Sequence, residues 1–241
     1  MSVRLVALVS LVKGLEDPGA EALALGLSRC ADSVDEIERS HAGLHIPGSF
    51  GGDLTWDLSF ESDASLAAFR SRGESSPAAG LIAALGPSFA DLIPSVARVD
   101  AVVVEPIDEH VGRRGLVGVK RTLLFRVRAD TPQAALERFE RDMLAMPFFV
   151  PAIRNWCFGR PRGAGSSRWT HIWEQEFESP DGLLNDYMAS PYHWGHIDAW
   201  YDPECPQSIV DPAVAHVYCP ESEGVLSWSS SVALGGCASS D

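Results

Sequence analysis

The first half of the chain alternates between short apolar or period-two runs, typical of strands, and stretches with apolar residues at helical spacing. The run from Val3 to Lys13 is apolar enough for a strand that is buried on both faces. Residues 18–31 begin at an Asp17-Pro18 pair, a favourable helix start, and predict a helix. The remaining elements are predicted as strand, strand, helix, helix and strand, at residues 37–46, 53–62, 64–72, 78–93 and 96–105. The order of this half is therefore β-α-β-β-α-β, with its second helix in two pieces.

The second half repeats this order. Its strand, helix, two strands, helical stretch and final strand are predicted at residues 118–128, 131–146, 154–159, 168–179, 180–201 and 213–219. The letters repeat as well, because WDLSFES from Trp56 to Ser62 matches WEQEFES from Trp173 to Ser179. The sequence therefore indicates an internal duplication.

The duplication predicts how the chain buries its sheets. A β-α-β-β-α-β unit carries its helices on one face of its sheet and leaves the other face uncovered. Two such units in one chain can cover each other. We therefore predict an α+β fold of two tandem ferredoxin-like domains, with their sheets packed face to face as an α+β barrel. The predicted domains are residues 1–107 and 118–220, joined by a linker at 108–117 and followed by a mobile tail at 221–241.

Composition narrows the class of protein. The chain has 241 residues, enough for two cores, and 46% of them are apolar, which is typical of a globular protein. Its net charge of −14 would repel a phosphate backbone or an anionic membrane surface. We therefore expect neither a nucleic-acid partner nor a membrane partner.

Cysteine usage bears on the compartment. The five cysteines show no CxxC spacing, which favours a reduced chain. The apolar run near the N-terminus has no convincing cleavage site for a signal peptide. The expected localisation is cytoplasmic.

Four short motifs in the second half carry a family resemblance. They are found at Val119–Phe125, Trp169–Ile172, Phe177–Ser179 and Asp186–His193. With these motifs the sequence resembles the dimeric α/β barrel, or stress-responsive A/B-barrel, family, over nearly all of residues 118–220 and more weakly over 3–106. Within that family, the second half is most similar to plant polyketide cyclases of the olivetolic acid cyclase type.

The resemblance implies roles for individual residues. In the cyclase a tyrosine and a histidine act together, and they match Tyr187 and His193. A further pocket histidine on the third strand matches His171. The first half has Arg70 and Leu54 where Tyr187 and His171 stand, so it is expected to be a supporting domain without a site.

The sequence also departs from the cyclase at three pocket positions. A histidine on the first strand, a tyrosine on the first helix and a histidine before the helical proline are replaced by Arg121, Met143 and Ser190. The substrate therefore does not follow from the resemblance.

The two matched residues suit proton transfer. Histidine can take and return a proton near neutral pH, so His193 is the predicted general base. A neutral tyrosine can donate a hydrogen bond to developing enolate charge, which is the role predicted for Tyr187. The predicted substrate-binding residues are His171, Arg121, His196, Trp173, Trp194 and Met143.

Structural roles compete with these assignments. His193 and His171 could pack within a core, and Trp173, as the repeat partner of Trp56, could be architectural. Structural roles are also expected for four further histidines, namely His41, His45, His110 and His216.

A metal site is the other alternative in this segment. His193 and His196 share a helical face, and Asp198, Asp202 and Cys205 follow them. The pattern lacks a recognised metal-binding motif, and no dinucleotide or phosphate fingerprint occurs. We therefore expect no metal and no cofactor.

These observations lead to three hypotheses of function. The first is a cofactor-independent acid–base enzyme, of lyase, cyclase or isomerase type, acting on a small carbonyl-containing, aromatic or polyketide-like molecule. The second is a non-catalytic small-molecule-binding or stress-associated protein, and the third is a cofactor-free monooxygenase. The expected partner is a small-molecule substrate. Both a monomer and a homodimer agree with the sequence.

Overall fold

The computed structural model describes residues 2–15, 17–73, 80–163, 167–221 and 223–228. Eight antiparallel strands form one sheet in the order β2-β3-β1-β4-β6-β7-β5-β8. The strands are β1 (Val3–Leu11), β2 (Arg39–Leu44), β3 (Leu54–Phe60), β4 (Val96–Val111), β5 (Gly118–Phe125), β6 (Asn155–Pro161), β7 (His171–Phe177) and β8 (Ala215–Glu221).

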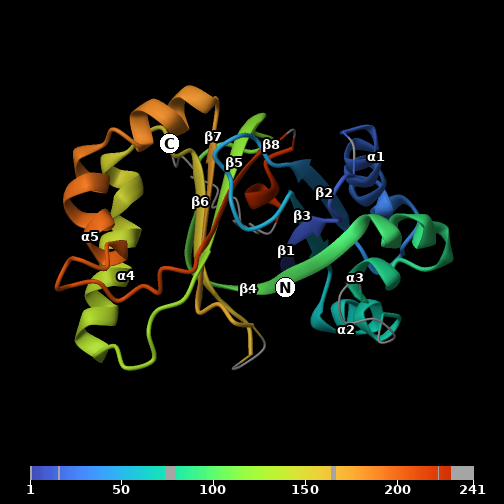
Figure 1. Ribbon diagram of the computed structural model, residues 1–241, viewed down its shortest axis with the longest axis horizontal. Helices are drawn as coiled ribbons and strands as arrows, with labels where there is room; N and C mark the ends of the chain where they lie inside the picture. Colours follow the sequence, from blue (N-terminus) through green and yellow to red (C-terminus); the bar gives the residue numbers. More distant parts are fainter. Residues whose placement is uncertain (1, 16, 74–79, 164–166, 222, 229–241) are drawn as a thin grey trace, which may run out of the picture.

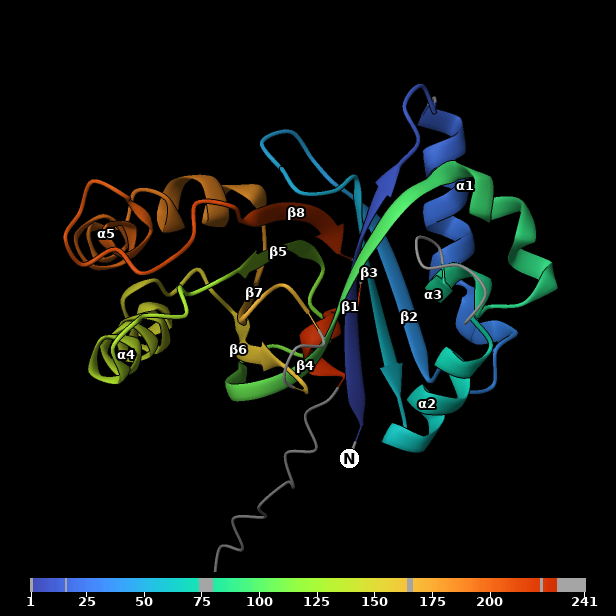
Figure 2. The same ribbon diagram turned by 60° about the horizontal axis from the view of Figure 1, so that its bottom comes forward.

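The helices form two outer layers, one for each half of the chain (Figure 1). The first layer contains α1 (Asp17–Ser28), η1 (Cys30–Asp32), α2 (Asp63–Ser71), α3 (Gly80–Ala83) and η2 (Pro87–Ser95). The second contains α4 (Gln133–Phe149), η3 (Gly182–Tyr187), η4 (His193–Ile197) and α5 (Asp198–Tyr201). A short turn, η5 (Val225–Ser227), follows β8. Figure 2 shows the strands of both halves between these layers.

The strands curve into a nearly closed barrel. β4 of the first half pairs with β6 of the second, so the two four-stranded halves become one sheet. At the other end, β2 and its following loop approach β8: the Ile46 amide donates to the Tyr218 carbonyl at 2.9 Å, and Phe50 forms a bridge with His216. Gly43 allows this approach, since a Cβ there would lie 2.9 Å from Cβ of Cys219. The predicted fold of two ferredoxin-like halves with facing sheets is confirmed.

The two halves are related position by position. Arg4 in β1 precedes Leu5, which pairs with Leu58 of β3; Lys120 in β5 precedes Arg121, which pairs with Gln175 of β7. The position equivalent to Arg121 is therefore Leu5. Trp56 and Trp173 are likewise equivalent, and both are fully buried in the core beneath their own helices.

The barrel interior contains a balanced group of charges. Lys120 lies 2.5 Å from Asp57 and 2.8 Å from Glu174, and Arg4 also pairs with Glu174. All four side chains are at least 95% buried. Burial would lower the pKa of Lys120, but Asp57 and Glu174 more than reverse this effect and raise it. Two cations thus face two carboxylates across the pseudo-twofold axis.

Two predicted boundaries differ from the structure. β4 continues to Val111 and pairs with β6, so residues 108–111 of the predicted linker belong to a strand. The beginning of the predicted tail is packed, since Val225 and Leu226 are buried and their amides donate to Glu221 and Glu176. Strand pairing therefore orders the first part of the predicted linker, and hydrogen bonds to two buried carboxylates order the beginning of the predicted tail. The rest of that tail, residues 229–241, lies outside the described residues.

Two further sequence expectations concern cysteines and membrane spans. Cys30, Cys157, Cys205 and Cys219 are free thiols, while Cys237 lies outside the described range. Burial raises the pKa of the Cys157 thiol to about 12, which makes it a poor nucleophile. In the parts of the chain described here, no helix combines the length and apolar content needed to cross a bilayer.

Candidate active site

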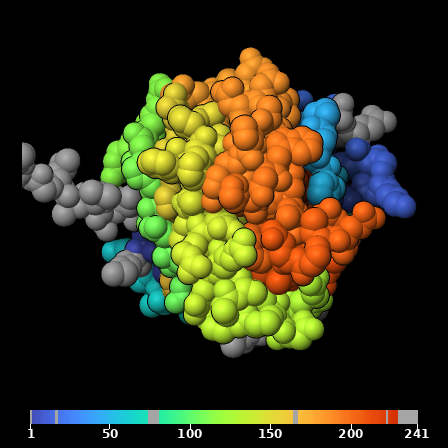
Figure 3. All heavy atoms as spheres, turned by 90° about the vertical axis from the view of Figure 1, so that its left-hand side faces the viewer, coloured from blue at the N-terminus to red at the C-terminus, as the bar shows by residue number. Residues whose placement is uncertain are grey.

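A pocket lies between the C-terminal helical layer and the sheet. Its volume is about 220 Å³. Figure 3 shows the outside of this layer, where α4 in yellow-green and residues 180–201 in orange cover the face. Its lining comes from β5, α4, η3, η4, α5 and β8 and consists of Arg121, Leu123, Met143, Tyr187, Met188, His193, Ile197, Asp198, Tyr201, Val214 and His216.

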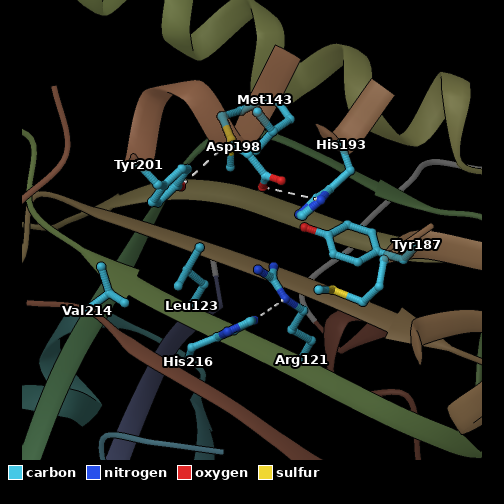
Figure 4. A pocket seen from close by; sticks show the side chains of 11 residues that line it. Arg121, Leu123, Met143, Tyr187, His193, Asp198, Tyr201, Val214 and His216 are labelled. Carbon is cyan, nitrogen blue, oxygen red and sulfur yellow. Dashed lines mark hydrogen bonds and ion pairs between the residues drawn. The ribbon is translucent and has the colours of Figure 1, made fainter. Parts of the chain in front are cut away.

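Two π-helical segments bring Tyr187 and His193 together. Tyr187 ends η3 and His193 begins η4, and the turn between them contains Ser190 and Pro191. The two rings lie 4.7 Å apart between centroids, and both side chains point into the pocket (Figure 4). The wide turns of π-helices are frequent at functional sites because they redirect side chains.

His193 is neutral at physiological pH. It is 8% exposed, and burial together with the charge of Arg121 lowers its pKa to about 4. Its Nδ1 lies 3.4 Å from a carboxylate oxygen of Asp198 but has no hydrogen-bond partner. A neutral imidazole with an unengaged nitrogen can accept a proton.

Tyr187 keeps its proton. It is 1% exposed, and burial raises the pKa of its hydroxyl, although Arg121 acts in the opposite direction. The guanidinium carbon of Arg121 lies 5.0 Å from the centroid of the Tyr187 ring. A neutral phenol beside a cation is a suitable hydrogen-bond donor to an oxygen that gains negative charge.

Arg121 is fixed by two neutral partners. Its Nε donates to Nε2 of His216 at 2.7 Å, and its Nη1 donates to Oε1 of Gln175 at 2.7 Å. Because arginine can only donate, Nε2 of His216 is the acceptor and carries no proton. Burial, then the charges of Arg121 and His193, lower the pKa of His216 to about 2.

The structure places His171 outside this pocket. Its ring is stacked between Phe125 and Phe158 at 5.2 and 5.6 Å, and its nitrogens contact Thr170 at 2.8 Å and Glu140 at 3.1 Å. These contacts satisfy both nitrogens. The predicted substrate-binding role for His171 therefore has no support in the pocket geometry, because its side chain is held within the aromatic core.

Three other predicted residues also lie outside the lining. Trp173 is fully buried in the core beneath α4. Trp194 is 66% exposed and donates its indole N–H to the Met188 carbonyl at 2.6 Å. His196 is exposed and stacks on Tyr192, because η4 is a π-helix, in whose wider turn residues three apart do not share a face as they would in an α-helix. Of the eight predicted site residues, Tyr187, His193, Arg121 and Met143 come together.

His216 is the pocket residue that sequence reasoning assigned to a structural role. β8 pairs with β5 so that His216 lies opposite Leu123 and Tyr218 lies opposite Arg121. Alternation along β8 puts both side chains on the helix-facing side with Arg121. The sequence signal for His216 as a pocket residue is therefore the period-two pattern of β8, and this pattern is informative only when the register of β8 with β5 is known.

The metal alternative can be compared with the geometry. Asp198 approaches His193, but His196 points away from it. Within the described ranges, no group of three or more His, Cys, Asp or Glu side chains is arranged to hold a metal ion.

Comparison with known proteins defines the class. Residues 119–211 match the model of the Stress responsive A/B Barrel Domain family, so the C-terminal half of the chain is a domain of that family. The whole chain shares the fold of tandem dimeric α/β barrel proteins. No curated protein sequence matches the chain significantly.

Solved structures support the same fold over the full length. An anthrone oxidase-like protein aligns with TM-score 0.59 and 11% identity, covering 91% of this chain and 90% of its own. A candidate monooxygenase from Fusobacterium nucleatum subsp. nucleatum gives TM-score 0.55 and 9% identity, with coverage of 92% and 95%. A chlorite dismutase variant from Candidatus Nitrospira defluvii gives 0.51 and 10%, with coverage of 94% of both chains. At these identities the likeness concerns the fold alone.

Proposed function

We propose that this protein is a cofactor-independent acid–base enzyme that removes a proton from a carbon next to a carbonyl group of a small molecule. The observation that carries the proposal is the burial of neutral His193 and neutral Tyr187 side by side, beside the cation of Arg121, on one pocket. A lyase, cyclase or isomerase of the kind expected from the sequence would begin with this step.

The step assigns one task to each side chain. The imidazole of His193 accepts the proton as the C–H bond breaks, and the electron pair moves onto the carbonyl oxygen. Tyr187 donates a hydrogen bond to that oxygen, and Arg121 stabilises its negative charge. His193 returns the proton later in the cycle.

The pocket limits the size and shape of the substrate. An engineered apolar cavity of about 150 Å³ holds benzene, and this pocket of about 220 Å³ is somewhat larger. Its apolar walls come from residues on several elements, namely Leu123, Met143, Ile197 and Val214. A substrate with one substituted ring, or a folded chain of similar size, fits these dimensions.

The proposal can be tested without knowing the final product. Aryl ketones and keto acids would be incubated with the protein in heavy water, and exchange of the α-proton for deuterium would be followed by NMR. We expect exchange faster than in buffer or with heat-denatured protein. A non-catalytic binding protein would instead shift the ligand signals without any exchange, and that result would remove the enzyme hypothesis.

A second assay, of oxygen consumption and anaerobic product formation, separates the oxygenase alternative. A carbanion formed in the pocket can react with oxygen, so a cofactor-free monooxygenase shares the first step. Oxygen consumption with a quinol or anthrone substrate would favour that activity. Unchanged product formation under anaerobic conditions would favour lyase, cyclase or isomerase chemistry.

A further inference from the structure

We infer that the pocket binds a small organic carboxylate, held by the guanidinium of Arg121, with the carbon skeleton of the ligand against the apolar wall. The inference deepens the proposed function. Its statement about the reaction rests on that function, whereas its statement about binding does not. Four observations carry it: the burial of Arg121, its neutral partners, its equivalent in the first half, and its neighbour Lys120.

Arg121 is a buried cation without a carboxylate partner. Arg121 is only 3% exposed, yet its guanidinium has no carboxylate of a described residue within 4 Å. Its hydrogen bonds go to an unprotonated imidazole and an amide, which orient the guanidinium but do not neutralise it. Asp198 lines the other side of the pocket beside His193, with its side chain 44% exposed to solvent, which screens its charge.

The first half of the chain shows that the fold does not require this charge. Leu5 and Leu58 occupy the positions of Arg121 and Gln175, and both are buried in an apolar core. A buried unpaired charge destabilises a protein relative to an apolar side chain. The second half therefore has Arg121 and Gln175 where the first half has two leucines. Because the fold is stable with leucine at these positions, the polar pair is better explained by ligand binding than by a contribution to folding.

The neighbouring residue shows how this chain treats a buried cation that serves the fold. Lys120 points to the opposite side of β5, into the barrel, where Asp57 and Glu174 lie within 2.8 Å. Arg121 faces the pocket, where no carboxylate of a described residue lies within 4 Å of its guanidinium nitrogens. A ligand carboxylate would neutralise the charge of Arg121 in the way that Asp57 and Glu174 neutralise the charge of Lys120.

Guanidinium geometry favours a planar anion. Its fork of N–H groups matches the two oxygens of a carboxylate, and low exposure strengthens the attraction. The Tyr187 ring and the apolar side chains next to Arg121 favour carbon on the other side of the ligand. An aryl or enolisable keto carboxylate combines both features.

The binding test uses benzoate and benzamide, which have nearly the same shape but differ in charge. Isothermal titration of the full chain at pH 7 would measure both. We expect benzoate to bind and benzamide to bind roughly thirtyfold or more weakly. Equal affinities, or no binding of benzoate at millimolar concentration, would overturn the inference. Competition by chloride or phosphate at equal concentration would also overturn it, because it would show a general anion site.

Variants connect the affinity to Arg121. Arg121→Met removes the charge at similar length and should lose benzoate affinity by roughly thirtyfold, without a lower melting temperature. Arg126→Met removes a charge from the same segment at an exposed position, 3.6 Å from Asp211, and should bind benzoate within about twofold of the wild type. If Arg121→Met fails to fold, Arg121→Lys keeps the charge without the fork and should bind with intermediate affinity. Wild-type affinity in a folded Arg121→Met variant would refute the assignment.

The outcome can be distinguished from that of the proposed function. Phenylpyruvate and phenylacetone form a second matched pair, a keto acid and a neutral ketone, for the deuterium-exchange assay. Benzoate binding that depends on Arg121, without exchange of either ketone, would keep the carboxylate site and remove the acid–base function. Equal exchange of both ketones, with no preference for benzoate over benzamide, would keep the function and remove the carboxylate site.

Discussion

His193 is the residue on which the proposed chemistry depends most directly, because it is the proton acceptor. Replacement by glutamine keeps a polar side chain of similar size but removes the proton acceptor. We expect α-proton exchange to fall by about a hundredfold or more, since general acid–base catalysis contributes that much. His110→Gln is the matched control because His110 is exposed on β4, far in the fold from the pocket. Equal loss in both variants, or none in His193→Gln, would exclude His193 as the base.

The lowered pKa of His193 predicts how activity depends on pH. Arg121, Tyr187 and Asp198 face its ring, and burial with Arg121 lowers its pKa to about 4. The base must be unprotonated, so kcat/KM should stay level from pH 8 to about pH 5.5 and fall only as the pH approaches 4. A pH–rate profile measures this, and a fall centred near 6.5, where an exposed histidine titrates, would contradict it.

The same shift affects folding, with a sign that can be worked out. The unfolded chain takes up a proton at His193 near pH 6.5, whereas the folded chain resists until about pH 4. The unfolded state therefore binds more protons in this window. The contribution of His193 to stability is intact above pH 6.5 and declines as the pH falls towards 4.

At the scale of elements, the segment 182–201, which carries His193, is anchored to α4 by two hydrogen bonds. Asp142 of α4 accepts a hydrogen bond from the Trp200 indole N–H at 3.0 Å, and its backbone carbonyl accepts one from the Tyr192 hydroxyl at 3.0 Å. Trp200 is 2% exposed, so its N–H has no access to solvent in place of this carboxylate. These contacts connect the segment that contains His193 to the longest helix of the layer.

Loss of the Asp142 carboxylate should therefore weaken the layer. Asp142→Ala leaves a buried donor unsatisfied, and we expect the free energy of unfolding in urea to fall by about 1–3 kcal/mol. Asp142→Asn retains an acceptor oxygen and should recover most of the loss. If Asp142→Ala is as stable as the wild type, the hydrogen bond does not hold the segment.

The elements themselves were largely predictable. Strand periodicity located seven of the eight strands to within three residues at each end, the exception being the C-terminal end of β4, and the helical stretch 180–201 was predicted as one unit. Its division into η3, η4 and α5 was not, because π-helical turns depend on packing rather than on spacing. The side-by-side placement of Tyr187 and His193 depends on that division.

At the scale of the whole molecule, the two halves are joined through the barrel interior by the charges around Lys120. Removal of Lys120 leaves Asp57 and Glu174 buried and only partly paired. Lys120→Met should lower the free energy of unfolding by about 3–5 kcal/mol, as for other broken buried pairs. Lys13→Met, a change of the same type at an exposed position, should be nearly neutral. Urea denaturation measures both, and equal stability would show that the interior charges do not hold the halves together.

Closure within one chain also bears on assembly. β4 pairs with β6 and the β2–β3 loop contacts β8, so the two sheets cover each other without a second copy. A monomer and a homodimer both agree with the sequence, and light scattering of the purified chain would measure its mass against the 26.0 kDa of one chain.

Sequence alone determined the order of the elements, the duplication and the barrel architecture, because strand and helix periods are local and a bare sheet face must be covered. Through a resemblance it also predicted Tyr187, His193, Arg121 and Met143 as site residues, and the structure brings these four to one pocket. Only the tertiary structure decided which charges are paired. Neighbours on a strand face opposite sides, and the groups they meet come from distant segments whose register no local pattern encodes. For that reason Lys120 meets two carboxylates in the barrel, while Arg121 meets His216 and an open pocket.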